Sequence, residues 1–230
     1  MHHVRLYETH TDHARPAGRH LRRPGGITPM NVTRGFAGRP RVPNPALPPG
    51  QYDAGDDWPV LSAEVTPELT PAQWSFRVDG LVEEPRTWNW EQAHELPASV
   101  YEGAIHCVTS WSKFGVRFGG VSLDAFLAVV RPHVSATHAV AYSHTGYTTN
   151  LPLADLTGGQ AWVAWEYDGE PLTPEHGGPA RLLVPHLYFW KSAKWIAGLR
   201  ILDHDEPGFW EQNGYHARGN PWEEQRYSGD

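Results

Sequence analysis

The only cysteine of this 230-residue chain, Cys107, lies in the run IHCVTSWSKFG at residues 105–115. An apolar, β-favouring stretch at residues 98–101 precedes it, and a predicted glycine turn at residues 118–120 follows it. A thiolate in a polar loop at the end of a strand is a suitable ligand for a mononuclear metal centre. The alternative is an inert thiol in the core, which is the commoner state of a free cysteine.

A second loop, residues 176–181, combines His176 and Arg181 with two glycines and leads into an apolar strand. Glycines let a bulky ligand approach the backbone closely, and a guanidinium can bind a phosphate through two parallel hydrogen bonds. Taken alone, Arg181 is more often a surface charge and His176 a turn residue. The interpretation as a binding loop therefore depends on the other two loops.

A third loop, residues 191–194, carries two lysines around Ser192 and Ala193. Backbone amides in such a segment can form a concave anion site, and Lys194 would add a positive charge. Together the three loops predict a pocket for a phosphorylated cofactor beside a thiolate.

The elements that position these loops are mostly strands. Alternating or apolar runs predict strands at residues 74–78, 139–142, 162–167, 182–185 and 195–202. An apolar stripe with helical spacing predicts a helix that begins after Ser122 and ends before Pro132, and Thr87 is the predicted N-cap of another short helix. Strands outnumber the short, scattered helices, so we expect an α+β fold with a mixed sheet, rich in loops.

Composition limits the partners and the compartment. A net charge of −7 and a pI of about 6.0 argue against nucleic acid or anionic membrane, and no run is long enough to span a bilayer. One cysteine excludes an internal disulfide, so a cytoplasmic location is the simplest expectation. Residues 1–57 are rich in Pro, Gly and His and are expected to be irregular, whereas residues 58–230 are expected to form the domain.

The motifs in combination resemble the molybdopterin-binding domain of the sulfite oxidase family, in particular its small stand-alone bacterial branch. The likeness covers residues 58–222 and rests on the runs IHCVTSWSKFG (105–115), EHGGPARLLVPHLYFWKSAKWI (175–196) and PGFWEQNGYH (207–216). It implies the fold of that domain and a molybdenum ion held by molybdopterin.

The resemblance also implies roles for particular residues. Cys107 would bind the metal. Tyr215 and Lys113 would orient the substrate. The residues that would hold the pterin and its phosphate are His176, Arg181, Ser192, Ala193, Lys194 and, by a looser alignment, Ser143.

Two departures from the family are visible. Trp111 and Ser112 stand where sulfite oxidases carry arginines that bind the anionic substrate, which leaves Lys113 as the cation of this stretch, and Gly214 replaces an acidic residue before the tyrosine. A pocket with fewer cations binds sulfite less well. The family's immunoglobulin-like and haem domains are not expected here.

The resemblance implies a molybdenum cofactor-dependent oxidoreductase that transfers an oxygen atom or an electron pair on a small, sulfur-containing substrate. It would need a separate redox partner, a haem or flavin protein. Two alternatives are a tryptophan-rich module that binds carbohydrate or peptide, and a cysteine hydrolase activated by His106, His144 or His176.

Overall fold

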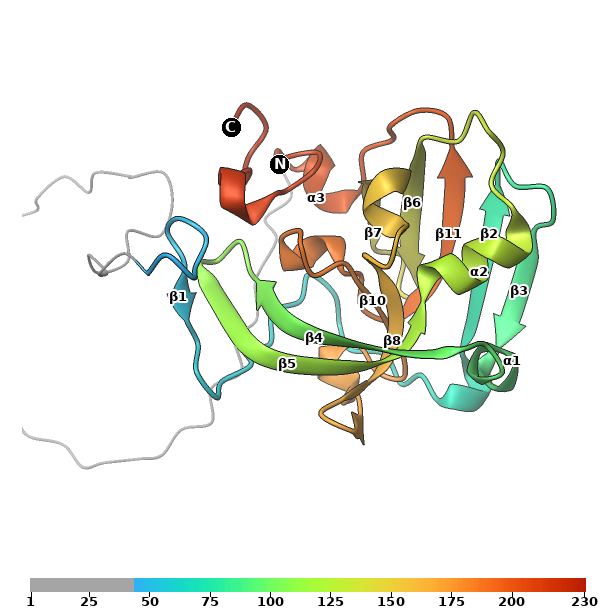
Figure 1. The fold of residues 1–230 in the computed structure, drawn as a ribbon, viewed down its shortest axis with the longest axis horizontal. Helices are drawn as coiled ribbons and strands as arrows, with labels where there is room; N and C mark the ends of the chain where they lie inside the picture. The colour runs from blue at the N-terminus through green and yellow to red at the C-terminus, as the bar shows by residue number, and fades with distance from the viewer. Residues whose placement is uncertain (1–43) are drawn as a thin grey trace, which may run out of the picture.

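The structure is a computed structural model that describes residues 44–230; it contains two sheets joined into one body (Figure 1). One sheet is built around β5, which pairs with β1 in parallel and with β4 and β8 in antiparallel orientation, while β8 also pairs with β9 and β10. Its strands are β1 (Tyr52–Asp53), β4 (Ala98–His106), β5 (Trp111–Ser122), β8 (Trp162–Tyr167), β9 (Glu170–Pro171) and β10 (Arg181–Leu183).

The other sheet has the order β3-β2-β11-β6-β7. Its central strand β11 is parallel to β2 and antiparallel to β6, which makes the sheet mixed. Its strands are β2 (Ser75–Gly80), β3 (Arg86–Asn89), β6 (His138–Ser143), β7 (Thr148–Pro152) and β11 (Ile196–Leu202). Mixed sheets with few, short helices confirm the expected α+β class.

The helices are short. They are α1 (Trp90–His94), α2 (Leu123–Val130) and α3 (Phe209–Gln212), with 3-10 turns η1 (Pro71–Gln73), η2 (Leu153–Leu156), η3 (Pro174–His176), η4 (Phe189–Lys191) and η5 (Pro221–Glu223). The predicted apolar stripe of α2 is buried in the core, and Ser122 caps the helix by accepting a hydrogen bond from the amide of Asp124. None of the described helices is long and apolar enough to cross a membrane.

Two local predictions were wrong. Thr87 lies inside β3, and the N-cap of α1 is Asn89, whose side chain accepts a hydrogen bond of 2.9 Å from the amide of Gln92. The predicted turn at residues 118–120 is part of β5; a Cβ at Gly120 would lie 2.1 Å from the carbonyl oxygen of Val163. That glycine is therefore needed for the close approach of β8, because no side chain fits between the strands.

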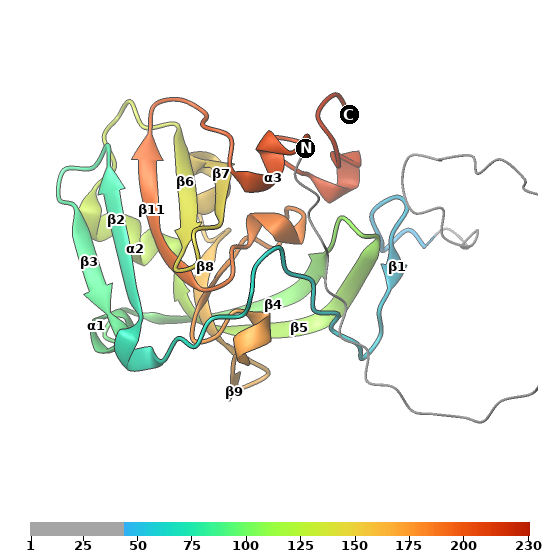
Figure 2. The same ribbon diagram turned by 180° about the vertical axis from the view of Figure 1, so that it is seen from behind.

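The long β4–β5 hairpin positions the cysteine. It runs from the five-stranded sheet toward β1 at the other end of the molecule, and residues 107–110 join its two strands (Figure 2). Strand β1 pairs Tyr52 with Trp111. The sheet thus begins before residue 58, the expected domain boundary, and residues 1–43 of the expected irregular segment lie outside the described residues.

Candidate active site

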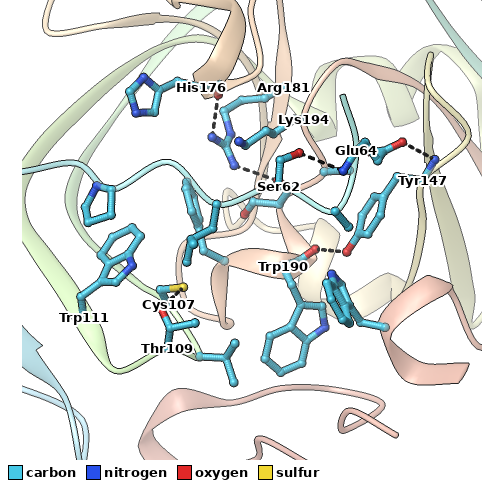
Figure 3. A pocket seen from close by; sticks show the side chains of 18 of the residues that line it. Ser62, Glu64, Cys107, Thr109, Trp111, Tyr147, His176, Arg181, Trp190 and Lys194 are labelled. Atoms are coloured by element: carbon cyan, nitrogen blue, oxygen red, sulfur yellow. Dashed lines mark hydrogen bonds between the residues drawn. The ribbon is translucent and has the colours of Figure 1, made fainter. Parts of the chain in front are cut away.

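A pocket forms where five parts of the chain meet: the loop after β4, the chain from residue 58 to 64, the turn between β6 and β7, the loops on either side of β10, and the region around α3 (Figure 3). It brings together seven of the nine residues predicted from the sequence, namely Cys107, His176, Arg181, Ser192, Ala193, Lys194 and Tyr215. These residues come from chain positions more than 100 apart, so the pocket depends on the folded sheet rather than on one local motif.

Cys107 is held in a tight loop. Its amide donates a hydrogen bond of 2.8 Å to the carbonyl of Trp111, and its carbonyl accepts one of 3.0 Å from the amide of Ser110. The Sγ lies 3.1 Å from the hydroxyl oxygen of Thr109 and faces the pocket. Burial raises the pKa of the Cys107 thiol, and the Thr109 hydrogen bond and the charges of Arg226 and Lys194 lower it in part. The effect of the protein's own groups is thus to favour the protonated thiol.

Segments near both ends of the described chain form hydrogen bonds to the loop at residues 107–110. Gln51 donates a hydrogen bond of 3.1 Å to the carbonyl of Cys107, and the amide of Tyr52 donates one of 2.8 Å to the carbonyl of Ser110. From the C-terminal segment, the guanidinium of Arg226 donates to the carbonyl of Val108. Three loop carbonyls are thus fixed by partners distant in sequence.

Arg181 is a buried cation with 1% exposure. Its guanidinium donates to the carbonyl of His176 at 2.7 Å and to that of Ser192 at 2.8 Å, and it lies 4.0 Å from the ring centre of Phe189. Burial lowers the pKa of Arg181 to about 9. Among residues 44–230 it forms no ion pair with a carboxylate, so its charge is compensated only by backbone dipoles and a ring face.

Lys194 lies near Arg181 in the same part of the pocket (Figure 3). Its Nζ donates a hydrogen bond of 2.6 Å to the carbonyl of Glu175. Burial first, and the nearby charge of Arg181 second, lower the pKa of Lys194 to about 7. Arg181 is buried and Lys194 is partly buried, and two such cations that repel each other are stabilised when an anion lies between them. This end of the pocket is therefore suited to a phosphate group.

The backbone around the two cations leaves room and donors for such a group. The amide of Ser192 donates a hydrogen bond to the carbonyl of Phe189. The amides of Ala193 and Lys194 have no hydrogen-bond acceptor in the described part of the chain. Gly177 has a φ of 104°, and a Cβ there would lie 3.0 Å from the Cβ of Arg181. Glycine is required because a side chain would crowd the cationic end.

His176 lines the pocket with both ring nitrogens engaged. Its Nε2 lies 3.2 Å from the carbonyl of Trp58, and its Nδ1 lies 3.0 Å from the hydroxyl of Thr173. Because a carbonyl can only accept, Nε2 carries the proton in this arrangement. Burial lowers the pKa of His176, and its ring stacks on Trp58 at 3.9 Å. A cofactor would meet a neutral, fixed imidazole.

The opposite end of the pocket, near the thiol, is aromatic. Tyr215 packs its ring 4.9 Å from Trp210 and 5.3 Å from Trp190. Burial, with smaller contributions from Tyr227 and Cys107, raises the pKa of Tyr215, so its hydroxyl keeps its proton near neutral pH and can donate a hydrogen bond. Tyr147, which the sequence did not indicate, donates from its hydroxyl to the carbonyl of Trp190 at 2.6 Å.

Other lining residues were also missed. Glu64 lies among the cations and accepts a hydrogen bond of 3.1 Å from the amide of Tyr147. Trp58 forms a wall against His176. Their segment, residues 58–64, has no regular hydrophobic period and no charged motif, so the sequence offers no signal for these two side chains.

Two predicted residues do not line the pocket. The Nζ of Lys113 donates a hydrogen bond of 2.8 Å to the carbonyl of Gly55 beside β1. The hydroxyl of Ser143 accepts a hydrogen bond of 3.0 Å from the amide of Tyr147. These positions do not support a direct role for Lys113 with substrate or for Ser143 with the pterin; Ser143 shapes the loop that presents Tyr147.

The geometry does not favour a cysteine hydrolase. His106 lies 2.8 Å from the hydroxyl of Ser112, and His144 lies 3.1 Å from the carbonyl of Ser75. Within residues 44–230 the hydrogen-bond partner of the Cys107 sulfur is Thr109, so no described histidine activates the thiol. Nor do the described residues contain a group of three or more His, Cys, Asp or Glu side chains that would hold a metal without another ligand.

Comparison with known proteins identifies the family of this chain. Residues 63–210 match the family described as oxidoreductase molybdopterin binding domain, which is more than half of the chain. The chain is 40% identical over 185 residues to the uncharacterized oxidoreductase YuiH of Bacillus subtilis, covering 80% of this chain and 93% of that protein.

Two further similarities are more distant. The chain is 28% identical to the putative protein-methionine-sulfoxide reductase subunit YedZ1 of Azospira oryzae, over 66% of this chain and 58% of that protein. It is also 28% identical to the protein-methionine-sulfoxide reductase catalytic subunit MsrP of Gluconobacter oxydans, over 66% of this chain and 55% of the other. The chain thus spans little more than half the length of these two relatives.

Among solved structures, the sulfane dehydrogenase SoxCD of Paracoccus pantotrophus matches with a TM-score of 0.56 and 22% identity, over 61% of this chain and 41% of that one. This match shows the shared fold. The chain belongs to the sulfite oxidase-like family of molybdopterin-binding oxidoreductases, and its cofactor is molybdopterin with molybdenum.

The residues present fit that cofactor. A phosphate would compensate the charges of Arg181 and Lys194, and Cys107 would supply one thiolate ligand to a metal held by the pterin.

Proposed function

We propose that this chain catalyses a two-electron oxygen-atom transfer on a small, sulfur-containing substrate at the thiol end of the pocket. The observation that carries the proposal is the joining, in one pocket, of a lone thiol, the buried cation Arg181 and the partly buried cation Lys194, neither of which forms an ion pair with a carboxylate among the described residues. A binding module for carbohydrate or peptide would need neither feature. Names of two relatives that refer to methionine sulfoxide reduction add support for a sulfur substrate.

The bound cofactor supplies the two-electron redox chemistry. The protein's part follows from its own groups. Arg181 and Lys194 neutralise the phosphate, and the amides of Ala193 and Lys194 are available to its oxygens. Cys107 would hold the metal as a thiolate, since a metal cation deprotonates a ligating thiol. The Tyr215 hydroxyl, which keeps its proton, can donate a hydrogen bond to substrate.

Electrons must enter or leave through another protein. We propose a haem or flavin protein as that partner. Two of the relatives are named as subunits, which supports an enzyme that works with a second component. We also propose a reducing compartment such as the cytoplasm, because a single cysteine provides no disulfide. Fractionation of cells that produce the untagged protein would test the location.

The proposed function is tested by metal analysis and turnover. Protein produced in a host that makes molybdopterin should contain about one molybdenum per chain and reduce a sulfoxide, or oxidise sulfite, with an artificial electron carrier. Cys107→Ser should fold, retain little molybdenum and show no turnover. Thr109→Val, which keeps the thiol and removes its hydrogen-bond partner, should retain the metal. Full activity of Cys107→Ser would disprove the assignment.

A further inference from the structure

Trp111 places a hydrogen-bond donor without a partner in the wall of the pocket. The residue is 4% exposed, and its indole Nε1 is buried and makes no hydrogen bond to any described residue. A buried N–H without an acceptor is unfavourable, and native structures rarely retain one without a reason. We therefore expect the acceptor to be a bound group.

Other buried indoles of the chain have acceptors within the protein. Trp74 donates from Nε1 to the carbonyl of Ile196 at 2.9 Å. Trp190, which also lines the pocket, donates to the carboxylate of Glu211 at 2.9 Å. The unpaired indole of Trp111 is thus not a general consequence of how this fold buries tryptophan.

The position of the indole indicates which part of the cofactor it can reach. Trp111 is the first residue of β5, and its carbonyl accepts the hydrogen bond from the amide of Cys107, so the two residues are fixed to each other. Figure 3 shows the indole beside Cys107, at the end of the pocket away from Arg181 and Lys194. A cofactor with its phosphate at those cations and its metal at Cys107 would bring the metal, rather than the phosphate, to the indole.

The sulfur of Cys107 is not the acceptor of this N–H. Its hydrogen-bond partner among the described residues is the hydroxyl of Thr109, at 3.1 Å. The acceptors that remain are the sulfur and oxygen atoms that would complete the coordination of the metal, and such atoms carry negative charge. The charges of Arg226 and Lys194 lower the pKa of the Cys107 thiol in part, so these cations also favour negative charge at this end.

We propose that the Trp111 indole N–H donates a hydrogen bond to a negatively charged sulfur or oxygen ligand of the molybdenum and thereby raises its reduction potential. Hydrogen bonds to the ligand atoms of a metal tune its potential, and a donor favours the more electron-rich state because it stabilises negative charge. Each one-electron reduction takes one electron from the haem or flavin partner and adds it to the metal centre. This inference rests on the proposed ligation of the metal by Cys107, but not on the identity of the substrate.

The first test uses the molybdenum-loaded protein without substrate. A redox titration with mediator dyes follows the EPR signal of Mo(V) in the wild type and in Trp111→Phe, which keeps an aromatic ring and removes the N–H. Loss of one hydrogen bond to a charged group should shift the ratio of oxidised to reduced metal about tenfold, which equals a fall in potential of about 59 mV for one electron.

Trp74→Phe is the matched control for this titration. It also removes a buried indole N–H, but Trp74 does not line the pocket. Its loaded molecules should have the wild-type potential, whatever the change in stability. The comparison therefore separates an effect on the metal from a general loss of packing.

A second measurement does not require a variant to retain the metal. Wild-type protein grown with tryptophan labelled with nitrogen-15 in the indole ring should show a hyperfine coupling between this nitrogen and the Mo(V) spin in pulsed EPR. Labelled Trp190→Phe should keep the coupling, because the N–H of Trp190 is bonded to Glu211.

Three results would overturn the inference: an unchanged potential in loaded Trp111→Phe, an equal fall in Trp74→Phe, or no nitrogen-15 coupling in the loaded wild type. Failure of the proposed function is distinguishable from these results. Loaded wild type that shows the coupling but turns over no sulfur compound would refute the function and support this inference. Wild type that retains no molybdenum would overturn both.

Discussion

The side-chain amide of Gln51 donates a hydrogen bond of 3.1 Å to the carbonyl oxygen of Cys107, across 56 positions of the chain. Gln51 also lies 3.4 Å from the hydroxyl of Ser112, which in turn lies 2.8 Å from the Nδ1 of His106. Burial lowers the pKa of His106 to about 4, so the ring stays neutral above that pH. A buried, uncharged chain of hydrogen bonds thus fixes the backbone of Cys107, the proposed metal ligand.

We expect Gln51→Ala to lower molybdenum content without unfolding the protein. Groups that orient a metal ligand without touching the metal typically contribute 10- to 100-fold to metal affinity, so the retained molybdenum should fall about tenfold after exposure to a chelator. The measurement is metal per chain before and after dialysis. Gln160→Ala is the matched control, since that amide also donates to backbone carbonyls but is exposed and outside the pocket. Equal retention by the two variants would contradict the prediction.

The pKa of Lys194, lowered to about 7 mainly by burial, predicts the pH dependence of anion binding to the cofactor-free protein. A lowered lysine pKa means that the charge is present below pH 7 and lost above it. Sulfate, whose own charge is constant over this range, should therefore bind most tightly below pH 7 and lose up to about tenfold in affinity per pH unit above it.

Glu64 and His176 also line the pocket, so the contribution of Lys194 to the pH dependence of sulfate binding is obtained by comparing the wild type with a Lys194 variant. In calorimetric titrations from pH 6 to 9, Lys194→Gln should bind sulfate weakly and with less dependence on pH. Lys113→Gln should resemble the wild type, since Lys113 is buried outside the pocket. A wild-type affinity that stays constant across pH 7 would argue against an anion site at Lys194.

Glu211 neutralises a fully buried lysine below the pocket. Its Oε1 accepts hydrogen bonds from the Nζ of Lys191 at 2.7 Å, from Trp190 at 2.9 Å and from Thr149 at 3.1 Å. Glu211→Ala would leave the Lys191 charge buried without its counter-ion, so the free energy of unfolding should fall by about 3–5 kcal/mol. Urea unfolding measures the change.

A surface pair provides the control for that experiment. Glu206 pairs with Arg200, and both side chains are nearly half exposed. Glu206→Ala should therefore change stability by less than about 1 kcal/mol. If the two variants lose similar stability, the buried pair has no special structural role.

Asp155 connects η2 to the C-terminal segment. Burial raises its pKa, but hydrogen bonds from His186 and Arg218 outweigh burial and lower the pKa of Asp155 to about 2. Because the carboxyl pKa is lower in the folded than in the unfolded protein, ionised Asp155 stabilises the fold at pH values above its pKa in the unfolded chain. This stabilisation is lost as the pH falls through the folded-state pKa of about 2. Asp155→Asn should cost about 2 kcal/mol at pH 7, and its difference from wild type should narrow between pH 4 and 2 in denaturant titrations. A difference independent of pH would contradict this assignment.

Those parts of the fold and site that depend on local pattern were predictable. The strand at Trp162–Tyr167 and the buried stripe of α2 follow from short-range spacing, and the structure confirms both. The loops of Cys107, Arg181 and Lys194 were recognisable because each places an unusual residue type next to an apolar strand. The pocket joins all three as expected.

The rest depended on contacts between distant segments. Nothing near Gln51 indicates that its amide reaches Cys107, and Tyr147 enters the pocket only because Ser143 bends the loop before it. Lys113 follows the cysteine closely, yet its Nζ is turned to Gly55. Proximity along the chain was a poor guide to these side-chain directions, which the packing of β1 against β5 decides.

The support of the Cys107 loop by distant segments limits how far the chain can be truncated for expression. The family match ends at residues 63 and 210, whereas Gln51 and Arg226, which brace that loop, and Trp58 and Tyr215, which line the cavity, all lie beyond those limits. A fragment trimmed to the match would keep the thiol and both cations but lose the residues that brace the loop and two of the aromatic rings that line the cavity. Recombinant versions should therefore retain both flanks.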